Sequence, residues 1–319
     1  MSAPASPLLN ALTVDVEEYF HPNAMDTAVH PDQWDALPHR VERNTIAVLD
    51  LLDELDTRAT FFVLGWVAER WPKLVAEVAR RGHEVACHGF AHRLVYKLGA
   101  AGFRDDVTRG KRALEDCLGT PVAGFRAASY SIVASTPWAL DVLVEAGFEY
   151  DSSIFPIRHD IYGIPGFNRF PVLVRCAAGE ILEIPPSTVR FLGRNWPAAG
   201  GGYFRLLPYR LTTWAIRRIN TIDQRPAMVY VHPWELDVAQ PRLAAGRASR
   251  LRQYTNLDKT EPRLRRLLRE FRFAPIRATM RGAAGSVERV DWEASLAALQ
   301  PHLAVAPPAA AARLSGGRR

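Results

Sequence analysis

Short apolar runs with strand character alternate along this chain with longer segments of helical spacing. The run 58–64 is rich in aromatic and β-branched residues, whereas apolar residues between 41 and 55 recur at helical intervals. Glycine follows the helical patterns as a stop signal, for example at Gly82 and Gly119. This alternation predicts an α/β protein in which helices wrap a parallel, barrel-like sheet. The expected strands are 11–14, 58–64, 83–86, 122–125, 148–150, 181–184 and 227–231, and the expected helices are 41–55, 65–81, 100–118, 135–147 and 207–219.

Length and composition limit the classes of protein to consider. At 319 residues, 48% hydrophobic and 23% charged, the chain suits one large α/β barrel or two ordinary globular domains. No apolar run approaches the roughly 18 residues that span a bilayer, and residues 1–7 lack the basic start and apolar stretch of a signal peptide. The three cysteines, Cys87, Cys117 and Cys176, are too widely spaced to suggest a disulfide framework or a cysteine zinc site. We therefore expect a cytoplasmic protein.

Two histidines four residues apart, His88 and His92, follow the expected strand 83–86. Upstream, the expected strand 11–14 runs into Asp15 and Glu17. Two imidazoles from one turn and a carboxylate from another strand end can form a three-ligand metal site with room for water and substrate. Such a site can make water nucleophilic near neutral pH. A histidine pair of this spacing is weak evidence alone, so the positions of the other polar residues matter.

Five polar residues each lie at the end of an expected strand or one residue past it. In a (β/α) barrel all these strand ends open onto one face, and that face carries the chemistry. A chance scatter of polar residues would not favour these positions, so the pattern supports a metal-containing active site. The five residues are Asp15, His88, Arg126, Asp151 and His232.

With these residues in these positions, the chain resembles the polysaccharide deacetylases of the NodB-homology group, carbohydrate esterase family 4. Within that group it is similar to the subfamily found beside exopolysaccharide and exosortase gene clusters. The resemblance covers about residues 10 to 280 and implies a distorted (β/α) barrel of the NodB type. It rests on five ordered motifs, Thr13–Phe20, His88–His92, Phe125–Tyr130, Tyr150–Ser153 and Val229–Glu235.

The resemblance implies a divalent metal, expected to be zinc, held by Glu17, His88 and His92. Asp15 would be the general base that deprotonates the attacking water. Arg126 would pair with Asp15 and hold both its orientation and its ionised form.

The resemblance also implies an acid on the other side of the scissile bond. His232 would give a proton to the departing amine, with Asp151 keeping the imidazole charged and aligned. A backbone N–H near Tyr130 would help to stabilise the oxyanion. Trp234 is the best candidate among the tryptophans for lining the substrate cleft.

Two departures from the family pattern affect these expectations. Asp15-Val16-Glu17 stands where the family has adjacent aspartates, and Ala128 stands where it has proline. Because alternate residues of a strand point to the same side, Asp15 and Glu17 share a side and Glu18 points away. We expect Glu17 to be the ligand, with Glu18 as the alternative. Ala128 loosens the loop that carries the oxyanion donor, which affects catalytic efficiency more than identity.

The resemblance and the composition divide the chain into regions. We expect one catalytic domain over 10–282, in which the insertion 156–208 forms part of the substrate rim. Residues 283–319, rich in Ala, Pro, Gly and Arg, are expected to form a low-complexity tail whose last part is disordered.

Basic residues are concentrated in one region, 242–281. This region has eleven arginines and one lysine against three acidic residues, a net charge of +9 in a chain whose total is +6. Its arginines alternate with leucines at helical spacing, which indicates either a surface helix with a solvated basic face or a docking face. An acidic partner for such a face would be an anionic glycan, a membrane surface or exopolysaccharide machinery. No nucleic-acid motif accompanies the charge, so nucleic acid is not expected.

Three functions remain open from the sequence. The first is metal-dependent N-deacetylation of an N-acetylated polysaccharide or its precursor, in exopolysaccharide biosynthesis. The second is hydrolysis of a small amide on the same fold, as in allantoinase-like relatives, and the third is glycan binding without catalysis. The intact set of Asp15, Arg126, Asp151 and His232 argues against the third, because binding alone needs no base and acid.

Overall fold

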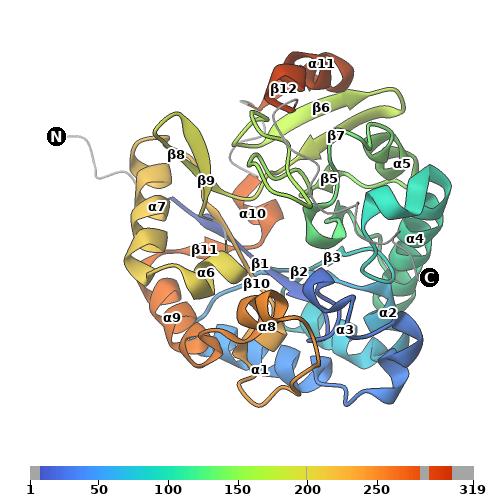
Figure 1. The fold of residues 1–319 in the computed structure, drawn as a ribbon, viewed down its shortest axis with the longest axis vertical. Helices are drawn as coiled ribbons and strands as arrows, with labels where there is room; N and C mark the ends of the chain where they lie inside the picture. The colour runs from blue at the N-terminus through green and yellow to red at the C-terminus, as the bar shows by residue number, and fades with distance from the viewer. Residues whose placement is uncertain (1–7, 199, 281–286, 304–319) are drawn as a thin grey trace, which may run out of the picture.

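The computed structural model describes residues 8–198, 200–280 and 287–303. Its strands form a mostly parallel sheet that curves into an incomplete barrel, with helices around the outside (Figure 1). The predicted α/β fold class is confirmed. In sheet order the strands are β10 (Met228–Val231), β1 (Asn10–Val16), β2 (Thr60–Val63), β3 (Glu84–Cys87), β4 (Gly124–Phe125), β5 (Tyr150–Asp151), β7 (Gly179–Glu183), β6 (Val172–Cys176) and β12 (Glu288–Asp291), and β11 (Phe273–Ala274) pairs with the start of β1.

Strand β1 lies between β10 and β2, and its side chains alternate between the two faces of the barrel wall. Leu12 and Val14 belong to the large core beneath the helices, whereas Thr13 and Asp15 contact Arg126 in the barrel interior. This is the alternation expected of a strand. Because β1 pairs in parallel with both β10 and β2, the residues that follow these strands come together at one end of the barrel.

Helices cover the outer face of the sheet (Figure 1). The helical pattern 65–81 is split in two, because Pro72 has no N–H to continue the first helix and begins the second. No helix in the described part of the chain is long and apolar enough to cross a membrane. The longer helices are α1 (Val41–Glu54), α2 (Gly65–Arg70), α3 (Pro72–Arg80), α4 (Val95–Leu118), α5 (Ala139–Glu145), α7 (Tyr209–Thr221), α8 (Arg247–Tyr254), α9 (Leu257–Glu270) and α11 (Trp292–Leu303).

The expected insertion, 156–208, contains secondary structure that the sequence analysis did not predict. It supplies β6, which pairs antiparallel with β7, the hairpin β8 (Thr188–Phe191) and β9 (Arg194–Pro197), and the short helix α6 (Gly202–Leu206). Gly200 bridges to Tyr230 of β10, at the edge where the barrel is open. A Cβ at this glycine would lie 1.9 Å from the Tyr230 carbonyl oxygen, so no other residue fits.

Residues 288–303 of the expected tail, 283–319, form secondary structure that the sequence analysis did not predict. β12 extends the sheet in parallel with β6, and α11 follows it directly (Figure 1). Trp292, at the start of α11, is 1% exposed and donates a hydrogen bond from Nε1 to the Pro137 carbonyl oxygen at 2.6 Å. One buried tryptophan therefore anchors a segment whose composition looked unstructured. Residues 304–319, where we expected disorder, lie outside the described residues.

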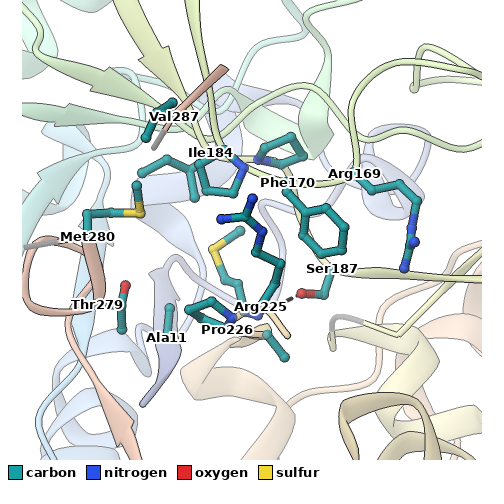
Figure 2. Close-up of a pocket in the computed structure, with 14 residues that line it drawn as sticks. Ala11, Arg169, Phe170, Ile184, Ser187, Arg225, Pro226, Thr279, Met280 and Val287 are labelled. Atoms are coloured by element: carbon teal, nitrogen blue, oxygen red, sulfur yellow. Dashed lines mark hydrogen bonds between the residues drawn. The ribbon is translucent and has the colours of Figure 1, made fainter. Parts of the chain in front are cut away.

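Helix α10 (Ile276–Met280) lies at the end of the barrel opposite the predicted site. The N–H of Ile276 donates to Thr60 at the start of β2, and the N–H of Arg277 donates to Glu84 at the start of β3. Beside α10 is a cavity whose lining includes Ala11 at the start of β1 and Met280 (Figure 2). This cavity is therefore separate from the strand ends that carry the chemistry.

The burial of Trp292 predicts that the C-terminal element contributes to global stability. Trp292→Ala should lower the free energy of unfolding by about 3 kcal/mol, because it leaves a cavity and an unpaired carbonyl group. Urea denaturation followed by circular dichroism measures this. Trp214→Ala removes a side chain that is 43% exposed and is the matched control, expected to cost less than about 1 kcal/mol. Equal effects of the two substitutions would contradict the packing of residues 287–303 on the sheet.

Candidate metal and catalytic site

Three predicted metal ligands meet at the open end of the barrel. Glu17 follows β1, and His88 and His92 follow β3. The potential ligand atoms of the three side chains lie within 4.8 Å of one another, and all three residues are buried. The strand order explains this meeting, because only β2 separates β1 from β3.

The ring of His88 is oriented by the backbone. Its Nδ1 donates a hydrogen bond to the Arg126 carbonyl oxygen at 2.8 Å, which leaves the lone pair of Nε2 for a metal. Burial lowers the pKa of His88 to about 4, so the imidazole is neutral at physiological pH. A neutral imidazole is the form that binds a metal.

His92 ends a tight loop that is held from helix α4. The Asp106 carboxylate accepts hydrogen bonds from the N–H groups of Phe90 at 2.8 Å and Ala91 at 3.2 Å. Gly89 has φ +75°, and a Cβ there would lie 2.6 Å from Asp106 Oδ2. His92 itself has φ +50°, an uncommon conformation for histidine. The sequence analysis missed Asp106, because nothing in the helical pattern of α4 marks this carboxylate.

The two candidate carboxylates have different tasks. Glu17 Oε2 lies 2.7 Å from His92 Nε2, and Glu17 Oε1 accepts a hydrogen bond from Trp234 Nε1 at 2.9 Å. Glu18 instead accepts hydrogen bonds from the N–H groups of Arg40 and Val41, at the first turn of α1. Glu18 is therefore a helix cap. This geometry supports Glu17, not Glu18, as the ligand.

The charge of Glu17 also suits a ligand. Burial alone would raise the pKa of Glu17, but the neighbouring His92, His232 and His88 outweigh it and lower the pKa, so the carboxylate stays ionised. One carboxylate oxygen and two imidazole nitrogens are a donor set that suits zinc and similar divalent ions. Apart from its contact with His92, Glu17 Oε2 has no hydrogen-bond partner among the described residues. The residues present therefore fit a divalent metal.

Arg126 and Asp15 form the expected pair. The guanidinium is fully buried, and its Nη1 donates to Asp15 Oδ1 at 2.7 Å and to Thr13 Oγ1 at 2.8 Å. Its Nη2 donates to Ser152 Oγ at 3.0 Å, and its carbon lies 4.0 Å from the ring centre of Phe62. The pairing of Asp15 with Arg126 thus lies inside the barrel, with the second oxygen of Asp15 facing His232.

His232 lies beside the carboxylates of Asp15 and Glu17. Its Nε2 is 3.9 Å from Asp15 Oδ2 and 3.7 Å from Glu17 Oε1. Burial alone would lower the pKa of His232, but the charges of Glu235, Glu17 and Asp15 raise it to about 9. The imidazole is therefore protonated at physiological pH in the described environment.

The carboxylate that orients His232 is Glu235, in place of the expected Asp151. Both Nδ1 and the backbone N–H of His232 donate to Glu235 Oε2, at 3.1 and 3.0 Å. Glu235 Oε1 accepts a hydrogen bond from the buried Arg205 at 2.6 Å. Burial alone would raise the pKa of Glu235, but His232 and Arg205 lower it to about 2. The signal for this role was present in the fifth motif, since Glu235 follows His232 by three residues.

Asp151 pairs with a carboxyl group of the neighbouring strand and does not contact His232. Asp151 and Glu183 are partners in the parallel register of β5 and β7. Burial raises the pKa of Asp151 to about 6, and burial together with the charge of Asp151 raises the pKa of Glu183 well above its ordinary value. Ser153 Oγ donates to Asp151 and accepts from the N–H of Ala127. This carboxyl pair therefore supports the loop that follows Arg126.

The two predicted substrate-binding residues lie deeper than expected. The Trp234 ring is 4% exposed and stacks on His232 with ring centres 5.2 Å apart, so it packs behind the site and offers no open face to a sugar. Tyr130 is also buried, and its N–H donates to the Ala127 carbonyl oxygen at 3.0 Å. The N–H of Tyr130 itself is thus engaged within the loop, and the oxyanion donor expected near Tyr130 stays a prediction.

Comparison with protein families agrees with this site. Residues 33–150 match the family model described as polysaccharide deacetylase, and residues 152–281 match a domain of unknown function, DUF3473. Over residues 33–150 the chain is therefore similar to polysaccharide deacetylases. The first match includes His88, His92 and Arg126, whereas His232 and Glu235 lie in the second. The cluster therefore draws on both matched regions and on Asp15 and Glu17, which precede the first match.

Individual relatives match part of this chain. A peptidoglycan-N-acetylglucosamine deacetylase of Bacillus cereus is 33% identical over 78 residues, 24% of this chain and 37% of the relative. A chitooligosaccharide deacetylase of Sinorhizobium fredii is 38% identical over 104 residues, 31% of this chain and 44% of the relative. The chain thus spans less than half the length of these relatives.

A solved structure shares the overall fold. A presumed polysaccharide deacetylase from Mycobacterium smegmatis superposes with a TM-score of 0.57 and 22% identity, over 90% of this chain and 96% of the other. This agreement extends over both matched regions, so the deacetylase domain and the DUF3473 region form the fold together.

The different contacts of Glu17 and Glu18 give a test of the ligand assignment. Glu17→Ala should cut zinc affinity by more than about 100-fold, because a charged ligand is lost. Glu18→Ala should keep zinc affinity but lower the free energy of unfolding by about 2 kcal/mol, because two N–H groups at the start of α1 lose their acceptor. Isothermal titration calorimetry with zinc and urea denaturation separate the two effects. The reverse pattern would make Glu18 the ligand.

Proposed function

We propose that this protein is a metal-dependent N-deacetylase that acts on an N-acetylated glycan. The proposal rests on one observation: two side chains that can transfer protons, Asp15 and His232, face each other beside the three candidate metal ligands. The side chains of Asp15 and His232 face each other at 3.9 Å, and His232 lies 3.7 Å from Glu17. A binding protein needs the metal ligands at most, whereas hydrolysis needs a base and an acid on opposite sides of the scissile bond.

Each residue has a distinct part in the proposed reaction. Asp15, held by Arg126 through Oδ1, takes a proton from the attacking water, whose oxygen forms a bond to the acetyl carbon. His232 gives its proton to the sugar nitrogen as the C–N bond breaks. The products are acetate and a free amine on the sugar. Glu235 is a positioning residue, since it fixes the ring of His232 and favours its charged form.

The metal that we propose is zinc, held by Glu17, His88 and His92. When bound, it would act as a Lewis acid on the acetyl carbonyl oxygen and favour ionisation of the attacking water. The protein keeps the ligands ready, since His88 is neutral and Glu17 is ionised. No thiolate belongs to the ligand set, since Cys87 is buried and burial raises the pKa of its thiol.

The substrate class that we propose is an N-acetylated polysaccharide or its precursor, in exopolysaccharide biosynthesis. The names of the relatives support the glycan class. The place of action that we propose is the cytoplasm, because the three cysteines are all free thiols. The test is acetate release by purified protein from chito-oligosaccharides, compared with turnover of small cyclic amides. Zinc binding without acetate release from any N-acetylated glycan would contradict the proposal, and turnover of cyclic amides alone would favour the small-amide function.

Removing the proposed base should stop chemistry while leaving the metal site intact. Asp15→Asn keeps the shape of the side chain but cannot take up a proton, so kcat should fall by about 100-fold or more. Zinc affinity, measured by calorimetry, should stay close to that of the parent. The substitution leaves the buried Arg126 without its counter-charge, so activity is measured at a temperature where circular dichroism shows a folded protein. Activity near the parent level would remove Asp15 from the mechanism.

The pairing of His232 with Glu235 predicts which carboxylate controls the pH dependence. The rate requires protonated His232 and falls as pH rises through its pKa, which Glu235 raises. Glu235→Gln should therefore move the alkaline limb of the pH profile to lower pH and reduce kcat by about tenfold or more at neutral pH. Asp151→Asn is the matched control, expected to leave the alkaline limb in place. A shift with Asp151→Asn but not with Glu235→Gln would restore the role first expected for Asp151.

A further inference from the structure

Exposed apolar side chains are concentrated in one segment of the chain. Ten large hydrophobic residues are exposed in the described part of the structure, and seven of them lie between 191 and 222. Leu192 is 82% exposed, at the tip of the β8–β9 hairpin. Single exposed apolar residues are common on any protein, but a cluster of this kind indicates an interaction surface.

The exposed residues form a continuous surface across two elements. The hairpin β8–β9 packs beside helix α7 at the edge of the molecule (Figure 1). Phe191 meets Trp214 of α7 edge to face, with ring centres 6.3 Å apart, and Trp196 Nε1 donates to the Phe191 carbonyl oxygen. Leu211 and Trp214 lie on one side of α7, and Ile222 follows at the end of the helix. We call this surface the hairpin patch: Phe191, Leu192, Trp196, Leu211, Trp214 and Ile222, with Arg190, Arg194, Arg210 and Arg218.

The hairpin patch is strongly basic. Between Glu183 and Asp223 the chain has six arginines and no acidic residue. Two of the six have carboxylate partners, since Arg205 pairs with Glu235 and Arg217 with Glu270. The four arginines of the hairpin patch form no ion pair with any residue that the structure describes. Their charge is therefore available to an external anion.

The basic region predicted from the sequence, 242–281, is less available. Arg263 donates to the carbonyl oxygens of Phe204, Arg205 and Leu207, where it fastens α9 to the end of α6. Arg265 pairs with Glu54 and Glu261, and Arg266 pairs with Glu270. Much of this charge is thus used within the fold. The hairpin patch differs in that its arginines adjoin exposed apolar side chains.

We propose that the hairpin patch docks the protein on an anionic phospholipid membrane. Aromatic and aliphatic side chains at a protruding tip insert at the boundary between headgroups and acyl chains, and arginines beside them bind the lipid phosphates. A glycan fits less well, because Leu192, Leu211 and Ile222 offer no flat ring for a sugar face. A nonpolar protein partner would not account for the four arginines without carboxylates. None of the residues in the hairpin patch belongs to the proposed metal and catalytic site.

Sedimentation with lipid vesicles tests the proposal. The full chain should bind vesicles of phosphatidylcholine with phosphatidylglycerol more tightly than phosphatidylcholine alone, and should lose affinity when salt rises from about 0.1 M to about 0.5 M. The double variant Phe191→Ser/Leu192→Ser should lower the vesicle partition coefficient by about tenfold or more, because the inserting groups are lost. Arg190→Gln/Arg194→Gln should remove the preference for the anionic lipid.

Matched controls remove exposed residues of the same kind from other surfaces. Val238→Ser/Leu251→Ser removes side chains that are 56% and 65% exposed, against 51% and 82% for Phe191 and Leu192. Arg247→Gln/Arg250→Gln removes exposed charge from the 242–281 region. Both controls should keep parental vesicle binding.

Three outcomes would overturn the proposal. The first is that the protein does not bind anionic vesicles, and the second is that the control variants lose as much vesicle binding as the hairpin variants. The third is that changing Phe191 and Leu192 leaves vesicle binding intact but abolishes either binding to a soluble polysaccharide or self-association.

Discussion

A guanidinium group buried in the centre of the barrel is the constraint on which the site depends. Arg126 is fully buried, so its charge must be met inside the protein. Asp15 supplies the counter-charge, Thr13 and Ser152 accept further hydrogen bonds, and the ring of Phe62 covers one face. These partners come from β1, β2 and the segment after β5. A single side chain thus fixes how the ends of several strands sit relative to one another, and it leaves Asp15 no freedom to turn away.

Arg126 also contacts both the proposed base and one of the proposed metal ligands. The side chain of Arg126 orients the proposed base, while its carbonyl oxygen accepts the hydrogen bond that orients His88. Base and metal ligand are therefore placed by one residue that follows one short strand. The loop after it is supported in turn from β5, through Ser153 and the N–H of Ala127. This support replaces the rigidity that a proline at position 128 would have given.

The sequence was sufficient to predict the site residues that lie at strand ends. It was not sufficient to predict contacts that depend on how one strand pairs with another. Asp15, Glu17, His88, Arg126 and His232 could be placed together, because parallel strands bring their carboxyl ends to one face and polar residues there are conspicuous. The partner of Asp151 could not be read from the sequence, since it depends on the register of β5 against β7. The structured residues 288–303 were also missed. They were grouped with the Ala-, Pro-, Gly- and Arg-rich end of the chain, and the anchoring role of Trp292 appears only when its contact with Pro137 is seen.

The exchange of Asp151 for Glu235 beside His232 has a physical reason. Two buried carboxyl groups in register cannot both stay ionised. Burial raises the pKa of Asp151 to about 6, and burial together with the charge of Asp151 raises the pKa of Glu183 well above its ordinary value. Such a group would be a poor permanent counter-charge for an imidazolium. Glu235 has Arg205 on its far oxygen, and its pKa of about 2 keeps it ionised at all pH values where the protein works. Because Glu235 lies on the same turn as His232, its contact with the ring does not depend on the register of distant strands. The proposed acid, His232, is therefore oriented by a residue of its own turn, whereas the proposed base, Asp15, is oriented by Arg126, which follows another strand of the barrel.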